Sequence, residues 1–169
     1  MNSNELKIVN VCGIPGSGKT TFCEWLEREK RFLHLDFDQL LCGRGNKVKL
    51  SLTDALRHGS AAFVSLVSNC GQSTVIDWGF PLTNLPIVRA LRNEGVAIWW
   101  FDGDRKAART AFSVRGTPSL SAFDTQLTSI ESNWSHIREV IEDHIIETIT
   151  AGPTHAKAEW IFEQMFGKK

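Results

Sequence analysis

A loop near the start of the chain has the residue types and spacing that bind phosphate. Gly13 is followed after four residues by Gly18, Lys19 and Thr20, which fits the pattern G-x-x-x-x-G-K-[ST]. Glycines let backbone N–H groups close around an anion, and a helix that begins at about residue 18 points its positive dipole end at the same anion. The spacing therefore predicts that residues 13–20 hold the phosphates of a nucleotide.

The positions of this loop have separate predicted roles. We expect Lys19 to reach the β/γ oxygens of the nucleotide and the hydroxyl of Thr20 to bind Mg²⁺. ATP and Mg²⁺ are therefore the predicted cofactors. The residues expected to contact the nucleotide are Gly13, Pro15, Gly16, Ser17, Gly18, Lys19, Thr20 and Thr21.

Acidic residues follow two apolar segments further along the chain. The stretch "LHLDFDQL" carries Asp36 and Asp38, and "TVIDWGF" carries Asp77. Residues two apart in extended chain point to the same side, so we expect Asp36 and Asp38 to face one site. Phosphoryl transfer needs one acid to accept the proton of the attacking hydroxyl, and others to hold Mg²⁺ directly or through water. The alternatives are solvated loop acids for the pair and a capping acid for Asp77.

Three arginines lie in the segment 101–120. Arg105 and Arg109 share one helix face, and Arg115 stands beside a glycine-proline loop. Guanidinium groups neutralise the charge that gathers on a transferring phosphoryl group, and a hinged loop can bring them in when substrate binds. We predict this role for Arg109 and Arg115, with a short lid around 115–120. The alternative is a solvated basic face of a helix.

These motifs resemble those of the small P-loop kinases. "GIPGSGKTT" is similar to their loop, and the D-x-D is similar to that of shikimate kinase, gluconate kinase and polynucleotide kinase relatives. "DWGF" resembles a group of uncharacterised ATP-binding kinase-like proteins. The segment 101–131 resembles the lid region of gluconate kinase-like enzymes, although Thr117 and Pro118 stand where a histidine often follows the lid arginine.

The resemblance implies roles that spacing alone leaves open. It implies that Asp38 is the base, that Asp36 assists the metal or the substrate, and that Asp77 lies near Mg²⁺. It also places the segment after the fifth strand, including Gly152, against the adenine ring. The positions that match the helix after the lid are Phe123, Gln126, Leu127, Ile130 and Glu131.

The apolar pattern indicates the elements that must position these residues. Strands are expected at 6–12, 31–38, 73–79, 96–101 and 145–149, with helices at 19–30, 51–69, 86–94, 104–115 and 154–166, and one helix or two broken near Asn133 over 123–141. Alternating strands and helices predict a parallel sheet, which binds ligands at the carboxyl ends of its strands. We predict a three-layer α/β P-loop NTPase fold with a five-stranded parallel sheet in the order 2-3-1-4-5.

Length and composition indicate the number of domains and the classes of partner that are expected. The 169 residues suit one domain, 1–169, and the 19 basic residues balance 19 acidic ones, which makes a nucleic-acid partner possible but not favoured. The four cysteines form no C-x-x-C pair, and no segment reads as a signal peptide or membrane span. We expect a cytoplasmic protein with reduced thiols that is a monomer or a homodimer and has no membrane partner.

The function predicted from the sequence is ATP- and Mg²⁺-dependent transfer of phosphate to a hydroxyl of a small molecule. One alternative is a kinase of polynucleotide 5′-hydroxyls, in which the basic residues Arg44, Lys47 and Lys49 contact phosphates. Another is a nucleotide-binding regulatory ATPase without an acceptor.

Overall fold

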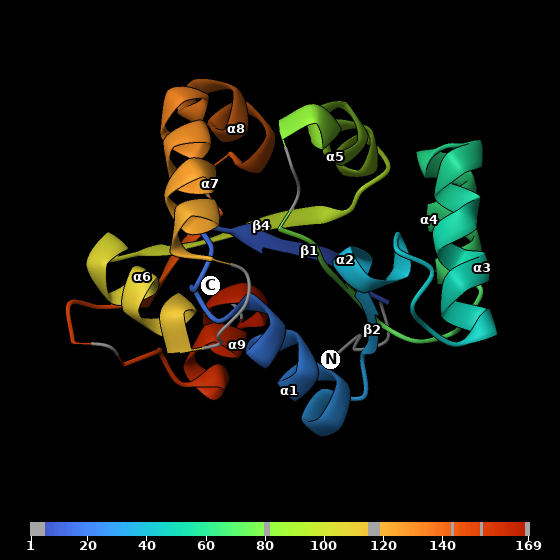
Figure 1. Cartoon of the computed structure of the whole chain (residues 1–169). Helices are drawn as coiled ribbons and strands as arrows, with labels where there is room; N and C mark the ends of the chain where they lie inside the picture. The colour runs from blue at the N-terminus through green and yellow to red at the C-terminus, as the bar shows by residue number, and fades with distance from the viewer. Residues whose placement is uncertain (1–5, 80–81, 115–118, 143, 153, 168–169) are drawn as a thin grey trace.

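A five-stranded parallel sheet forms the centre of the protein. The structure is a computed structural model that describes residues 6–79, 82–114, 119–142, 144–152 and 154–167. The strand order is β2-β3-β1-β4-β5, with every neighbouring pair parallel (Figure 1). The predicted fold class and strand order are confirmed. The strands are β1 (Ile8–Gly13), β2 (Leu33–Asp36), β3 (Thr74–Asp77), β4 (Ala97–Gly103) and β5 (Ile145–Ile149).

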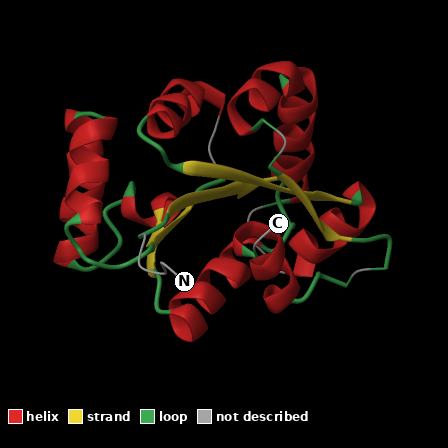
Figure 2. Ribbon diagram, turned by 180° about the vertical axis from the view of Figure 1, so that it is seen from behind, coloured by secondary structure: helices red, strands yellow, loops and turns green. Residues whose placement is uncertain are grey.

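Helices cover both faces of the sheet, as Figure 2 shows. On one face, α1 (Lys19–Lys30) and α9 (Ala158–Phe166) pack over a core cluster that includes Val11 and Phe101. The other helices contribute to a second cluster that contains Trp100. These helices are α2 (Phe37–Leu40), α3 (Lys47–Ala55), α4 (Ser60–Ser68), α5 (Leu85–Asn93), α6 (Arg105–Val114), α7 (Leu120–Ser132) and α8 (Trp134–Ile141).

The first five residues of β4, 97–101, are all apolar because both faces of the strand are covered. Successive side chains of a strand point to opposite faces, and Trp99 packs with the α1/α9 cluster whereas Trp100 belongs to the other one. A strand covered on both faces therefore carries apolar residues at consecutive positions, in contrast to the alternating pattern of a half-exposed strand.

The segment after β2 differs from its predicted form. The helix α3 begins at Lys47, because the Asn46 side chain accepts a hydrogen bond of 2.8 Å from the backbone N–H of Lys49 and caps the helix. The helical segment then breaks at Gly59, which has a φ of 122°. The predicted single helix over 51–69 is therefore wrong.

Two helix boundaries lie in the C-terminal half of the chain, at Asn133 and at the start of α9. The helical pattern over 123–141 is broken at Asn133, so the two-helix alternative is confirmed as α7 and α8. The last helix, α9, begins at Ala158, four residues later than predicted, since His155 pairs with Ile149 in an antiparallel bridge. None of the helices in the described ranges has both the length and the apolar character that a bilayer crossing requires.

Candidate functional site

The glycine loop, residues 13–20, joins β1 to α1 and lies tightly against the rest of the protein. Gly13 has a φ of 141° and Gly16 a φ of 79°, both in the region that favours glycine. A Cβ on Gly13 would collide with the carbonyl oxygen of Phe101, and a Cβ on Gly16 with that of Ala108. Glycine is therefore needed here for close approach to β4 and α6 as well as for the backbone conformation.

Hydrogen bonds inside the loop fix its curvature. The ammonium of Lys19 donates to the carbonyls of Gly13, at 3.1 Å, and Ile14, at 2.8 Å. The hydroxyl of Ser17 also donates to the carbonyl of Ile14, at 2.8 Å. The side chain of Lys19 thus folds back over the loop and places its positive charge at the N-terminal end of α1, where an anion is favoured.

Two residues from the C-terminal part of the chain bind backbone carbonyls of the loop. The hydroxyl of Thr148 donates to the carbonyl of Ser17 at 2.8 Å. His155 Nε2 lies 2.9 Å from the carbonyl oxygen of Gly16, which can only accept, so this nitrogen carries the proton. No local sequence pattern links these two residues to the loop, so their role could not be predicted from the sequence.

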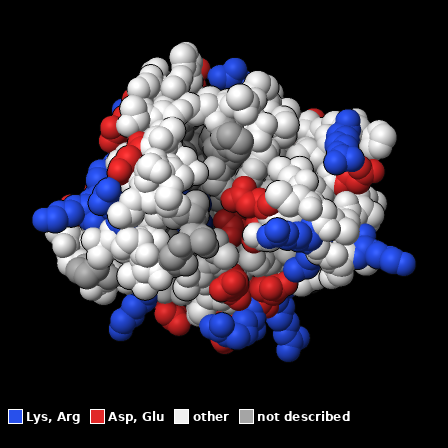
Figure 3. Space-filling view, in the orientation of Figure 1, with Lys and Arg blue, Asp and Glu red and all other residues white. Residues whose placement is uncertain are grey.

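A cavity of about 520 Å³ opens beside the glycine loop, a size typical of small-ligand sites. The predicted residues Lys19, Thr20, Asp38 and Asp77 all line it. On the face of the protein that Figure 3 shows, acidic side chains gather beside a hollow in the middle of the surface. The loop residues that also line the cavity are Gly13, Pro15, Gly16 and Gly18, whereas Ser17 is buried and Thr21 is exposed outside it.

The far wall of the cavity is mostly apolar. Trp100 of β4 and Phe112 of α6 form part of it, beside one face of α7 that presents Gln126, Ser129 and Ile130. Of the residues matched to the lid helix of gluconate kinase-like enzymes, Gln126 and Ile130 thus face the cavity, while Phe123 is buried in the core. A few hydrogen-bonding groups on an apolar wall are typical of a site for a small organic ligand.

Asp36 and Asp38 take different positions, which corrects the prediction that both face one site. The strand β2 ends at Asp36, whose side chain accepts a hydrogen bond of 3.0 Å from the backbone N–H of Gln39 and caps α2. Asp38 lies in the first turn of α2 and reaches the cavity. The expected extended geometry is wrong because the chain turns into a helix between the two acids.

The surroundings of Asp38 favour its protonated form. Burial of the carboxylate, followed by the negative charges of Asp77 and Asp36, raises the pKa of Asp38 above its usual value. Lys19 and a hydrogen bond from the backbone N–H of Gly79 oppose the rise. A carboxyl group with a raised pKa is a stronger proton acceptor once it is ionised, as a general base requires.

This raised pKa predicts that Asp38→Asn stabilises the fold at neutral pH. The folded protein binds the Asp38 proton more tightly than the unfolded chain, so ionisation costs stability as pH rises from about 4. Water reaches the carboxylate through the open cavity and weakens the effect, so we expect the melting temperature at pH 7 to rise by about 1–3 °C. Thermal denaturation across pH 4–8 measures this, and the gain should shrink toward pH 4.

Two predicted residues, Arg109 and Gly152, do not line the cavity, and a third, Arg115, is not among the described residues. Arg109 forms a bidentate pair with Asp124, at 2.9 and 3.0 Å, on the exposed surface of α6 and α7. Arg115 and residues 116–118 of the predicted lid lie outside the described residues, and Ser119 caps α7. Gly152 is exposed in the turn after β5. The functional roles of Arg109, Arg115 and Gly152 stay predictions.

Comparison with known proteins places this geometry in a fold group. No family model matches the sequence, and no curated protein sequence matches it. A gluconokinase from Sinorhizobium meliloti has a similar structure, with a TM-score of 0.53 and 14% identity over 94% of this chain and 88% of that one. The chain has the fold of the small P-loop kinases. A shikimate kinase from Bacteroides thetaiotaomicron is also similar, with a TM-score of 0.48 and 14% identity over 85% of this chain and 86% of that one.

The residues of this P-loop kinase fold fit a nucleotide with Mg²⁺. The hydroxyl of Thr20 and the carboxylates of Asp38 and Asp77 line one cavity, and Mg²⁺ prefers such oxygen ligands. The P-loop amides and Lys19 supply the positive potential that phosphates need. The donor set is therefore chemically suited to both groups.

Proposed function

We propose that the protein is an ATP- and Mg²⁺-dependent phosphotransferase that phosphorylates a hydroxyl group of a small molecule. One observation carries the proposal: Lys19 and Thr20 of the P-loop share a cavity with Asp38 and Asp77. These acids are distant from the loop in sequence, because Asp38 follows β2 and Asp77 ends β3. A phosphate-binding loop beside a candidate base is the arrangement that transfer to a hydroxyl requires.

Each residue has a defined part in the proposed reaction. The P-loop amides and Lys19 bind the β- and γ-phosphates, and Thr20 with Asp77 holds the metal, with Asp36 as a more distant acidic group. When bound, Mg²⁺ neutralises charge on the phosphate oxygens. The oxygen of the acceptor hydroxyl bonds to the γ-phosphorus while Asp38 accepts the hydroxyl proton. The bond from that phosphorus to the bridging oxygen of ADP breaks. Arg109 and Arg115 are the proposed groups that stabilise the transferring phosphoryl on closure.

The wall formed by Trp100, Phe112 and α7 supports an acceptor that is small and partly apolar. Gln126 and Ser129 offer an amide and a hydroxyl for hydrogen bonds, which fix the orientation of a polyhydroxy compound. Among the described residues that line the cavity, Lys19 is the sole cation. An acceptor carboxylate would therefore have to share Lys19 with the phosphates.

The contacts of the basic residues Arg44 and Lys49 do not favour a polynucleotide acceptor. The ammonium of Lys49 pairs with Glu27 at 2.9 Å, and Arg44 contacts the side chain of Gln39. These groups are therefore engaged within the protein, and they do not line the cavity beside the P-loop.

The test is the release of ADP from ATP and Mg²⁺ across a panel of sugars, sugar acids, nucleosides, amino alcohols and oligonucleotides, with phosphorylated product identified by mass spectrometry. We expect one class of hydroxyl compound to raise ADP release at least about 10²-fold above the rate without acceptor, since a bound acceptor replaces water as nucleophile. Slow ADP release with no phosphorylated product from any acceptor, oligonucleotides included, would instead indicate a regulatory ATPase.

A further inference from the structure

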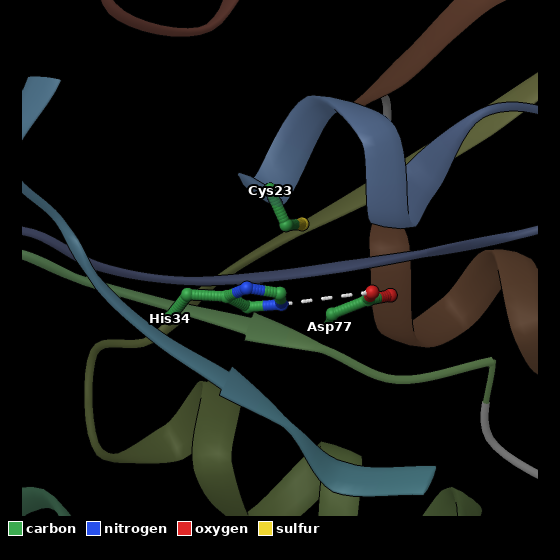
Figure 4. A group of neighbouring side chains, drawn as sticks. All are labelled: Cys23, His34 and Asp77. Atoms are coloured by element: carbon green, nitrogen blue, oxygen red, sulfur yellow. Dashed lines mark ion pairs between the residues drawn. The ribbon is translucent and has the colours of Figure 1, made fainter. Parts of the chain in front are cut away.

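Three side chains that can bind a metal meet between α1 and the sheet. Cys23 lies on α1, His34 on β2 and Asp77 at the end of β3. Their ligand atoms all lie within 4.8 Å of one another. Figure 4 shows the three side chains converging, with His34 Nε2 and Asp77 Oδ2 3.7 Å apart.

The cluster is buried and its polar atoms are not satisfied. The exposed fractions are 0% for Cys23, 7% for His34 and 4% for Asp77. His34 Nε2 and Asp77 Oδ2 each have no hydrogen-bond partner among the described residues, and their separation is too long for a hydrogen bond. Buried polar atoms without partners cost stability, so a ligand that binds both atoms would be favoured here.

The chemistry of the three ligands selects the metal. A thiolate, an imidazole and a carboxylate are ligands of Zn²⁺, whereas Mg²⁺ takes oxygen ligands. In a tetrahedral site with bonds of about 2.0–2.2 Å to nitrogen and oxygen, two such ligand atoms lie about 3.3–3.5 Å apart, slightly less than the 3.7 Å between His34 Nε2 and Asp77 Oδ2. The three ligand atoms lie within 4.8 Å of one another, so their side chains must move closer together when the metal binds. The two negative charges of the thiolate and carboxylate also cancel the charge of Zn²⁺, as burial requires.

We propose that Cys23, His34 and Asp77 form a buried zinc-binding site, with a water molecule as the fourth ligand. Asp77 also lines the cavity, so this water can come from that side. The site goes beyond the proposed phosphotransferase function, and it shares the Asp77 carboxylate with the predicted magnesium site of that function.

Binding of zinc to this site must release a proton. Burial, and then the negative charge of Asp77, raise the pKa of the Cys23 thiol well above its usual value, so the metal-free protein holds a protonated sulfur. Zn²⁺ forms its bond to the thiolate, and the thiol proton leaves to solvent. The other side of His34 faces Glu27, with Nδ1 3.8 Å from Oε2, and Glu27 in turn pairs with Lys49. This carboxylate can orient the imidazole, as carboxylates do behind histidine ligands of zinc.

The experiment adds Co²⁺ alone, as a spectroscopic substitute for Zn²⁺, to the full chain after treatment with a chelator and without nucleotide. We expect about one Co²⁺ per chain and a near-ultraviolet charge-transfer band that requires a thiolate ligand. Zn²⁺ should displace the Co²⁺ and abolish the band. Added instead to the metal-free protein in weakly buffered solution, Zn²⁺ should release about one proton per chain.

Variants identify which thiol binds. Cys23→Ser should abolish the band, and His34→Gln should weaken Co²⁺ binding at least about 10-fold. The matched control replaces the two exposed cysteines, Cys42→Ser with Cys70→Ser, and should retain the band. Thr20→Ala should retain it too, which separates this site from the predicted magnesium site.

A second measurement keeps the test decisive if a variant folds poorly. Zn²⁺ should raise the melting temperature of the wild type and of the control with both exposed cysteines replaced, because it binds only the folded state. The proposal is overturned if the wild type shows neither the band nor a shift in melting temperature. It is also overturned if the band survives in Cys23→Ser or disappears in that control.

Discussion

Lys19→Ala should reduce the affinity for Mg·ATP by about 10–100-fold, because a hydrogen bond to a charged group contributes about 1.5–3 kcal/mol. Phosphoryl transfer should fall further, by at least about 10²–10³-fold, since the ammonium also meets the charge that develops on the transferring group. Both effects follow from the position of Lys19, which curls over the P-loop carbonyls of Gly13 and Ile14 at the edge of the cavity. Calorimetry with Mg·ATP and the rate of ADP release measure the two losses separately.

The matched control for this substitution is Lys106→Ala, which removes the same side chain from an exposed position of α6 outside the cavity. It should bind and turn over ATP as the wild type does. Thermal denaturation must accompany both variants, because Lys19 also donates hydrogen bonds within the loop and its loss can loosen the fold. A folded Lys19→Ala variant that binds Mg·ATP with unchanged affinity would contradict the assignment of residues 13–20 as the phosphate site.

The strands were predictable because their signals are local and strong, and their order was predictable because it belongs to the P-loop fold that the loop motif indicates. A strand buried on both faces must be apolar at consecutive positions, as in β4, where Trp99 and Trp100 enter opposite cores. The P-loop was equally predictable, since its function depends on consecutive residues. Gly13 and Gly16 approach Phe101 and Ala108 too closely for any side chain, so the spacing of the glycines carries the geometry.

The segment between β2 and β3 was predicted less well because two local signals competed. Ser51 and Asp54 match a capping pattern, but Asn46 lies earlier and caps the helix first. The apolar spacing then continues past Gly59, where the chain in fact breaks. The positions of Asp36 and Asp38 were predicted wrongly because a short helix was missed. The helical turn that begins at Phe37 brings Asp38, and not Asp36, to the cavity.

The supports of the site could not be predicted, because they depend on contacts between distant parts of the chain. Thr148 holds the P-loop from 131 residues away and His155 from 139 residues away. His34 is similar: its strand pattern indicates a buried position, but the pattern does not reveal that Cys23 and Asp77 lie beside it. Such pairings appear only once the sheet order and the crossover helices bring the segments together.

Asp38→Asn should abolish transfer while leaving nucleotide binding almost intact. Asparagine keeps the shape of the side chain and can still accept the hydrogen bond from Gly79, but it cannot take the proton of the acceptor hydroxyl. General-base catalysis contributes about 10²–10⁴-fold, so kcat should fall by that factor, while the Kd of Mg·ATP changes by less than about threefold. Because the pKa of Asp38 is raised, the wild-type rate should decline on the acid side from a higher pH than an ordinary carboxyl gives, and this decline should be lost from the residual activity of the variant.

Two further variants test whether the role belongs to Asp38 itself. Asp54→Asn changes an exposed acid that pairs with Arg57 outside the cavity, and it should leave kcat and Kd unchanged, since exposed ion pairs contribute little. Asp36→Asn retains the cap of α2, because asparagine caps as well as aspartate, and its loss of kcat should be smaller than that of Asp38→Asn. Since Asp36 does not line the cavity, a larger loss at Asp36 would transfer the role of base to the capping acid and would require α2 to unwind before the reaction.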